Sequence, residues 1–397
     1  MITLKRVASL GTFALISLIG WRSYKHFFDT TTPVVQISGI DTQHWYAGDI
    51  NCTVSCNKAG CISAWIDDKS LISHFDITAN RPHPFTVPTR TIANGQHSFK
   101  LELTDSTFNR NITTIEHTFN IDNTQLQAYL LVPEGEHRVL QGRTLHVQFQ
   151  VNKEIEKAHV EALSNSYDCY AETKNSRIYE AFIPISCEER ASEYLYNVMI
   201  SDHVGSTLTL ENKFQVVPFP FKKQTLTMSE DKVREEEELG RDSRELADEL
   251  ERLTATSPKE KLWRGEFCQP IDVQRVTCDY GTIRTTQHKG RYAHKALDVI
   301  NTPRSVVWST QNGVVVLKDR FAASGNTVVV DHGCGILSLF FHLDDFAKIE
   351  VGQKIAKGEP LGKLGKTGYA SGYHLHWEMR IGNIPVDPMQ WTRTSLL

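Results

Sequence analysis

Short runs of alternating apolar and polar residues dominate the first half of the chain. An alternation with a period of two predicts strands that bury one face. Such runs occur in two blocks, separated internally by turn residues such as Asn94-Gly95; they cover 34–37, 98–103, 116–121, 145–151 and 213–217. Blocks of about 100 residues built in this way predict two immunoglobulin-like β-sandwiches. We assign them to 32–123 and 124–221.

The segment 229–253 has helical periodicity. Leu239, Leu246, Leu250 and Leu253 follow one another at spacings of seven, four and three, which places them in one stripe on a helix. The segment holds 11 Asp and Glu against 5 Lys and Arg. We interpret 222–261 as an acidic helical linker that packs on a neighbouring domain. A regulatory helix that covers a functional groove or docks a partner is the alternative, and charge alone does not separate the two.

Apolar runs interrupted by glycine return from Trp263 onward. They cover 305–309, 313–317, 327–331 and 337–341. Because helical periodicity is almost absent here, we predict an antiparallel β domain over 262–397. The fold class predicted for the whole chain is therefore mainly β.

The N-terminal segment 1–31 is predicted to lie outside these domains. An apolar run from Val7 to Trp21 follows Lys5 and Arg6. It is short for a membrane-spanning helix, which needs about 17–25 residues. It is long for the core of a signal peptide, and no Ala-x-Ala-like cleavage site follows it. We favour an uncleaved signal anchor in the membrane over a cleaved signal, and either interpretation predicts that the remaining chain is exported.

Charge and cysteine content narrow the class of protein further. A net charge of −4 gives no electrostatic case for nucleic-acid binding. In an oxidising compartment, Cys169–Cys187 and Cys268–Cys278 are plausible disulfides, and a cluster of three cysteines in the first block would supply one more. That cluster consists of Cys52, Cys56 and Cys61. Zinc binding by these three is the alternative, but it lacks a fourth ligand.

A group of histidines and one aspartate carries the candidate chemistry. Because alternate residues of a strand share a face, His374 and His376 would point the same way. These two imidazoles, a distant histidine and a carboxylate are four potential ligands. Three of them would suffice for a tetrahedral zinc whose fourth position is taken by water. His294 and Asp298 would be about 13 Å apart in an extended strand. If both bind one metal, the chain must bend between them, which predicts a turn or the start of a strand.

These residues also resemble a known family. His294-Lys295-Ala296-Leu297-Asp298, Phe341-His342-Leu343 and the stretch 367–376 that ends in His374-Leu375-His376 are similar, in this order, to the signature of the M23 (LytM or lysostaphin-type) zinc metallopeptidases. The resemblance covers about 263–391. It implies one zinc per chain with His294, Asp298 and His376 as ligands, and His342 and His374 as the catalytic pair beside it.

The sequence departs from the family pattern at three positions. Ala296 and Arg304 stand where glycine is usual, so a left-handed backbone at Ala296 would be strained. Tyr373 stands where proline is common. These departures bear on substrate preference and local geometry, because each ligand and each catalytic histidine is present. Arg284 and Tyr292 are further candidates for lining the groove.

The resemblance and the expected export together predict an envelope-anchored zinc endopeptidase. It would hydrolyse peptide bonds in peptidoglycan stem peptides or cross-bridges, with its soluble part in the periplasm of a bacterial envelope. One alternative is a non-hydrolysing LytM-type regulator of a separate cell-wall hydrolase, and another is an exported peptidase directed at proteins. The two sandwiches or the acidic helix would be available to an envelope protein partner.

Overall fold

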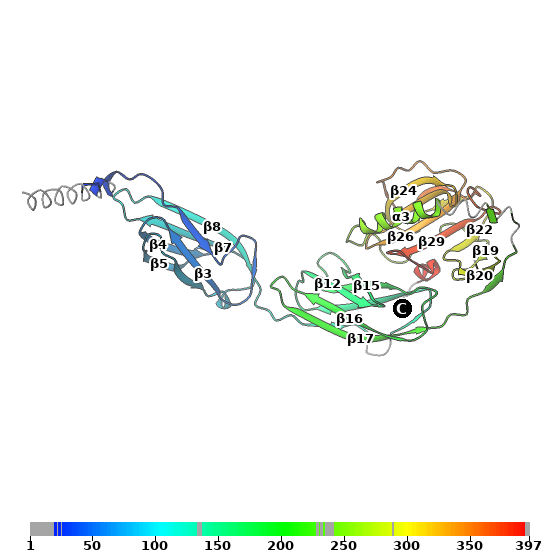
Figure 1. Ribbon diagram of the computed structural model, residues 1–397, viewed down its shortest axis with the longest axis horizontal. Helices are drawn as coiled ribbons and strands as arrows, with labels where there is room; N and C mark the ends of the chain where they lie inside the picture. Colours follow the sequence, from blue (N-terminus) through cyan, green and yellow to red (C-terminus); the bar gives the residue numbers. More distant parts are fainter. Residues whose placement is uncertain are drawn as a thin grey trace, which may run out of the picture. The chain divides into compact units, whose positions relative to one another are not determined.

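The computed structural model describes residues 20–21, 23–24, 26–132, 137–227, 230, 233–234, 242–287 and 290–393 (Figure 1). The chain is mainly β, as predicted, and divides into two compact units, 1–125 with 203–205 and 126–202 with 206–397. Residues 1–19, 22 and 25 of the predicted anchor segment 1–31 lie outside the described residues. Within them, no helix has the length and hydropathy that crossing a membrane requires.

The first unit consists of two sheets that share one apolar core. Strands β3 (Ile50–Cys56) and β4 (Gly60–Ile66) bury every second residue, as the alternation predicts, whereas β5 (Lys69–Ile77) is buried only at its last residue. Val54 and Leu101, one from each sheet, are both fully buried in this core. The three-stranded sheet has the order β1 (Val35–Ser38), β3 (Ile50–Cys56), β6 (His83–Val87), and the five-stranded sheet has the order β2 (Trp45–Tyr46), β8 (Ile112–Ile121), β7 (Gly95–Asp105), β4 (Gly60–Ile66), β5 (Lys69–Ile77). A short 3₁₀ helix, η1 (Thr89–Thr91), precedes β7.

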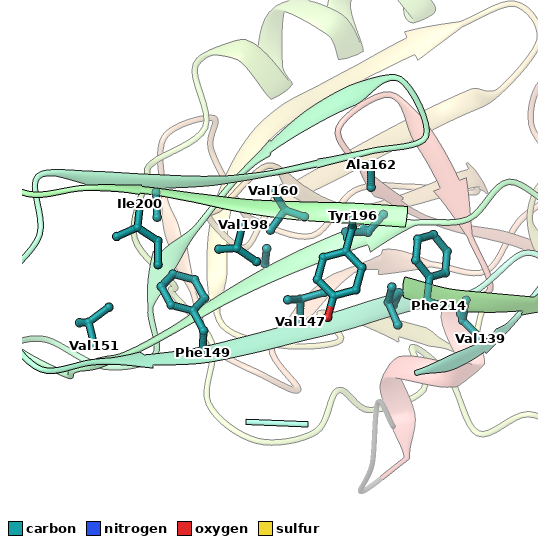
Figure 2. Close-up of a cluster of buried hydrophobic side chains, with 14 of the residues drawn as sticks. Val139, Val147, Phe149, Val151, Val160, Ala162, Tyr196, Val198, Ile200 and Phe214 are labelled. Carbon is teal, nitrogen blue, oxygen red and sulfur yellow. The ribbon is translucent and has the colours of Figure 1, made fainter. Parts of the chain in front are cut away.

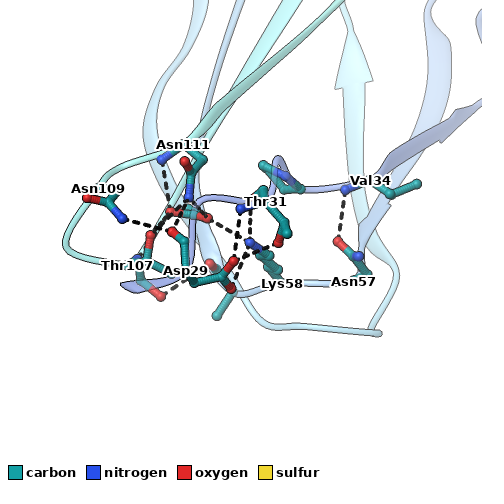
Figure 3. Close-up of polar contacts among 12 residues, drawn as sticks. Asp29, Thr31, Val34, Asn57, Lys58, Thr107, Asn109 and Asn111 are labelled. Atoms are coloured by element: carbon teal, nitrogen blue, oxygen red, sulfur yellow. Dashed lines mark hydrogen bonds and ion pairs between the residues drawn. The ribbon is translucent and has the colours of Figure 1, made fainter. Parts of the chain in front are cut away.

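A polar cluster fastens the beginning of this unit (Figure 3). The Lys58 ammonium lies 3.0 Å from the Asp29 carboxylate and 3.2 Å from that of Asp105. Asp105 is buried and also accepts hydrogen bonds from Thr107 and Asn111. Because buried carboxylates are stable only when they are paired and hydrogen-bonded, this network holds the segment before β1 against two loops.

Two further sheets form the first half of the second unit. Val147 and Phe149 of one sheet face Val160 and Val198 of the other across a closed apolar core (Figure 2). The five-stranded sheet has the order β10 (Arg138–Leu140), β17 (Thr207–Val217), β16 (Glu193–Ser201), β12 (Lys157–Ala162), β13 (Asn165–Asp168), and the four-stranded sheet has the order β14 (Tyr170–Ala171), β15 (Ile178–Pro184), β11 (Thr144–Val151), β9 (Ala128–Leu130).

An eight-stranded sheet, antiparallel at every pairing, forms the centre of the C-terminal domain. Its order is β19 (Arg275–Cys278), β22 (Leu297–Ile300), β29 (Leu375–Ile381), β26 (Ile336–Leu343), β25 (Gly325–Asp331), β24 (Gly313–Phe321), β27 (Lys354–Ile355), with β30 (Ile384–Val386) paired to β29. Smaller elements surround it; they are β18 (Lys223–Thr225), β20 (Ile283–Thr286) and β21 (Gly290–Ala293) in one sheet, β23 (Val306–Trp308) with β28 (Pro360–Lys363) in another, and the 3₁₀ helix η2 (Pro388–Thr392).

Helix α3 (Asp242–Ala255) lies on one face of the large sheet (Figure 1). Leu246, Leu250 and Leu253 are buried against the sheet, as the stripe predicts; their partners are Leu317, Phe321, Val329, Leu337, Leu339 and Phe341. Leu239, the first residue of the predicted stripe, lies outside the described residues. The segment assigned to the linker is also not purely helical, because β18 pairs with β20.

The second sandwich and the C-terminal domain share an apolar contact. Phe182 of β15 packs against the rings of both Trp263 and Trp391, with ring centroids 5.7 and 5.5 Å away. Beside it, the Gln390 side chain accepts a hydrogen bond from the backbone N–H of Thr144 at 2.7 Å and donates one to the carbonyl of Thr144 at 2.9 Å. These contacts hold the two parts of this unit together.

The cysteines differ from the sequence-based expectation. All eight fall within the described residues, and none forms a disulfide there. Cys52 and Cys56 instead join the apolar core of the first unit. Cys268 donates to the Ser309 carbonyl, whereas Cys278 ends β19, so the pairing expected between these two is absent.

Candidate metal centre

Two neighbouring strands and the segment before one of them bring the predicted metal ligands together. Asp298 of β22 is the cross-strand partner of His376 of β29, and residues paired in this way point to the same face. His294 lies just before β22, so the bend expected between His294 and Asp298 is present. Ala296, within this bend, does not have a positive φ, so the strain considered for that position does not arise.

The distances between these side chains fit a metal ion. Nε2 of His294 lies 3.2 Å from Oδ2 of Asp298, and Nδ1 of His376 lies 3.0 Å from Oδ1 of the same carboxylate. In a tetrahedral zinc site with bonds of about 2.0–2.1 Å, neighbouring ligand atoms are about 3.3 Å apart. The donor set of two imidazoles and one carboxylate, and its spacing, therefore suit zinc.

His342 reaches this face through a bulge in β26. The pairing with β25 shifts between Asn326 and Val328, and His342 has a φ of +62°. A non-glycine residue in the left-handed region is uncommon, and such strain costs about 1–3 kcal/mol. This backbone conformation brings the His342 ring to 4.7 Å from the ring of His374 and 5.9 Å from that of His376, measured between ring centroids. All five residues predicted for the site thus meet at one place.

Hydrogen bonds to carbonyl groups define the tautomers of the two remaining histidines. Nδ1 of His342 lies 2.9 Å from the carbonyl oxygen of Thr367, and Nδ1 of His374 lies 2.9 Å from that of Gly372. A carbonyl oxygen only accepts, so each Nδ1 carries the proton and each Nε2 has a lone pair. Nε2 of His374 is 4.0 Å from Oδ1 of Asp298, which places that lone pair at the site.

Burial and mutual contacts perturb the pKa values at the site. Burial would raise the pKa of Asp298, but hydrogen bonds from His294 and His376 outweigh it and hold that pKa well below its usual range. Burial acts in the opposite direction on a histidine and would lower the pKa of His294, but contacts with Asp298 and Cys278 outweigh burial and raise this pKa to about 9. Burial, with the neighbouring His374, lowers the pKa of His342 to about 3. A metal bound by His294 would therefore displace a proton.

His376 is held by residues that the sequence analysis did not select. The Phe341 ring lies parallel to the His376 ring at 5.0 Å, and Oε2 of buried Glu378 is 3.9 Å from Nε2 of His376. Arg380 donates to Glu378 at 2.5 Å. A carboxylate behind a ligating imidazole fixes the orientation of its ring. The alternation along β29, which puts Glu378 on the same face as His376, is the signal that would have found it.

Cys278, which the sequence analysis assigned to a disulfide with Cys268, also lies at the site. One potential ligand atom from each of Cys278, His294 and Asp298 lies within 4.8 Å of the others, the one such group of metal-binding side chains found among the described residues. His376 is outside that group but contacts Asp298 directly. The site thus has four candidate donors rather than three.

Four other residues were singled out from the sequence: two as candidates for lining the groove and two as departures from the family pattern. Arg284 lies 3.6 Å from Asp298, and Tyr292 is its cross-strand partner, so both are near the site. Tyr373, at the position where the family often has proline, is partly exposed. Arg304 does adopt a positive φ, of +63°, at the position where the family usually has glycine. Its guanidinium pairs with Asp344 and Asp345.

The family resemblance is supported by comparison with known proteins. Residues 292–388 match the model of peptidase family M23. The C-terminal part of this chain therefore contains an M23 peptidase domain.

Two curated relatives illustrate the match. The DD-carboxypeptidase/endopeptidase Mpg of Neisseria meningitidis serogroup B (strain ATCC BAA-335 / MC58) is 31% identical over 122 residues, which are 30% of this chain and 28% of the relative. The peptidoglycan DD-endopeptidase ShyA of Vibrio cholerae is 32% identical over 36% of this chain and 31% of the relative. The match thus spans less than a third of the length of either relative.

Among solved structures, an M23 peptidase from Pseudomonas aeruginosa is similar with a TM-score of 0.47 and 22% identity. The similarity covers 64% of this chain and 95% of that one.

Proposed function

We propose that this chain is a zinc-dependent endopeptidase that cleaves peptide cross-links of peptidoglycan. The observation that carries the proposal is the convergence of His294 and His376 on Asp298, at 3.2 and 3.0 Å, inside an M23 domain. The named relatives are DD-endopeptidases, which supports a DD cross-link between stem peptides as the bond that is cleaved.

We also propose where the protein acts. The apolar run from Val7 to Trp21 supports an inner-membrane anchor, with the soluble part in the periplasm. In this proposal, the two sandwiches are immunoglobulin-like spacers or binding modules between the membrane and the cell wall. An envelope protein partner would bind to them or to the acidic helix predicted over 229–253.

The residues of the site divide the work of hydrolysis. His294, Asp298 and His376 would hold one metal ion, which, when bound, lowers the pKa of a water ligand and polarises the scissile carbonyl. Amide hydrolysis also needs one group to take a proton from the water and another to stabilise the oxyanion or protonate the leaving amine. His342 and His374 are suited to these two tasks, because each presents Nε2 and their rings are 4.7 Å apart.

A digestion of isolated cross-linked peptidoglycan by the purified full chain tests the proposal. Products would be separated by chromatography and identified by mass spectrometry, with and without a chelator and with zinc added back. His342→Ala is expected to lower the rate by about 10²–10⁴-fold. His376→Ala is expected to weaken metal binding, and the matched variant His159→Ala, in β12 of the second sandwich, should leave the rate unchanged.

The decisive result is that of the unmodified chain. If it binds one zinc and yet leaves cross-linked muropeptides intact, the proposal is wrong, and the non-hydrolysing regulator becomes the better account. Cleavage that a chelator does not reduce would refute the role assigned to the metal.

A further inference from the structure

A β-bulge places Cys278 in the same row as two of the proposed metal ligands. Along β19, Val276 pairs with Val299 of β22, so a regular register would put Thr277 opposite Asp298. The register shifts after Val276, and Cys278 takes that position instead. Because Asp298 in turn pairs with His376, Cys278 lies in a row across three strands and faces the site.

The distances allow the Cys278 sulfur to reach a metal at this site. Its sulfur and one ligand atom each of His294 and Asp298 are mutually within 4.8 Å. Zinc binds thiolate sulfur at about 2.3 Å and imidazole nitrogen at about 2.0–2.1 Å, which separates such ligand atoms by about 3.5 Å. A movement of about 1 Å is therefore enough to complete the coordination.

The surroundings of Cys278 are not those of a cysteine that only fills space. Buried free cysteines usually behave as small apolar residues. Cys52 and Cys56 do so in the core of the first unit. Cys278 is 7% exposed but belongs to none of the apolar clusters in the described part of the chain, and its sulfur interacts with His294 and, at 3.7 Å, with the carbonyl of Asp279.

His294 belongs to the same group through its other ring nitrogen. Nε2 lies 3.2 Å from Oδ2 of Asp298, whereas Nδ1 forms no hydrogen bond within the described residues and faces away from a metal held by Nε2. A bound ion would account for the convergence of Cys278, His294 and Asp298 on one point.

We propose that Cys278 is a fourth, displaceable protein ligand of the metal held by His294, Asp298 and His376. This inference rests on the metal centre of the proposed function and adds its regulation. Sites with four protein ligands are closed, whereas catalytic sites keep a position open for water. The resting enzyme is then slowed several-fold by its own thiolate but keeps a basal rate, so the zinc-bound wild type still cleaves cross-linked muropeptides. Activation requires the thiolate to leave; it takes a proton from the water that replaces it and becomes a neutral thiol.

Cobalt spectroscopy tests the proposal without relying on activity. Cobalt(II) is added under reducing conditions to the metal-free full chain, and absorption and metal content are measured. The wild type should bind one cobalt with a sulfur-to-cobalt charge-transfer band. Cys278→Ser and Cys278→Ala should lose the band while still binding cobalt, with a dissociation constant at least about tenfold higher. The matched variant Cys268→Ser should keep the band.

The outcomes separate this inference from the function on which it rests. Cobalt binding by the wild type without the band would refute the role of Cys278 and leave the metal centre intact, as would a band that persists in both Cys278 variants. Absence of cobalt binding would refute the metal centre itself. At full metal loading, Cys278→Ala should cleave cross-linked muropeptides several-fold faster than the wild type, and an equal or lower rate would refute the inhibited resting state.

Discussion

His332 should make the stability of the C-terminal domain dependent on pH. Its side chain is fully buried just after β25. Nδ1 lies 2.8 Å from the Asn312 carbonyl and Nε2 lies 2.9 Å from the Ser338 hydroxyl, while the ring of Phe267 packs edge-on at 4.9 Å. Burial lowers the pKa of His332 from 6.5 to about 4.

The sign and size of the effect follow from this shift. The unfolded chain binds a proton at this histidine more readily than the folded one, so protonation favours unfolding. The contribution of neutral His332 is complete above pH 6.5 and is lost as the pH falls from 6.5 to about 4. Each unit of pKa corresponds to about 1.4 kcal/mol, so the total loss in the free energy of unfolding is about 3 kcal/mol.

Urea unfolding, followed by tryptophan fluorescence, measures this loss. Between about pH 7.5 and about pH 5 the wild type should lose about 2 kcal/mol more than His332→Asn, which is less stable at neutral pH but has no titrating group at this position. His159→Asn, a partly exposed histidine in β12, is the matched control and should keep the wild-type dependence. Equal slopes for the wild type and His332→Asn would refute the reasoning.

Two further predictions concern the support of the site. Leu250→Ala should destabilise the packing of α3 by about 2–5 kcal/mol, because the Leu250 side chain is only 1% exposed where it packs on the sheet. Hydrogen exchange of the α3 amides measures this loss. The control is Leu195→Ala, at a residue that is 74% exposed, and equal protection of α3 in the two variants would contradict the prediction. Glu378→Gln should lower metal affinity by about 10–100-fold in a metal titration while the chain stays folded, because the carboxylate orients His376; an unchanged affinity would contradict that role.

Local patterns in the sequence predict much of this structure because they report which face of an element is buried. Alternation along 98–103 and 145–151 predicts β7 and β11, and the leucine spacing predicts the buried stripe of α3. The order of the histidine motifs predicts that five residues from three separate segments form one site, and those five side chains do converge. The strands, the buried stripe and the proximity of the five side chains were predictable because periodicity and motif order are properties of the chain itself, while the roles assigned to the five residues stay predictions.

The tertiary structure alone decides which other side chains join the site. In a sheet, a register shift of one residue exchanges the two faces, and nothing in the sequence marks where a bulge occurs. One bulge turns His342 toward His374, and another puts Cys278, rather than Thr277, opposite Asp298. Without the register, the cysteine content and the expected export suggest only a disulfide between Cys268 and Cys278. Only the register across three strands places Cys278 beside His294 and Asp298, where its sulfur faces the proposed metal site.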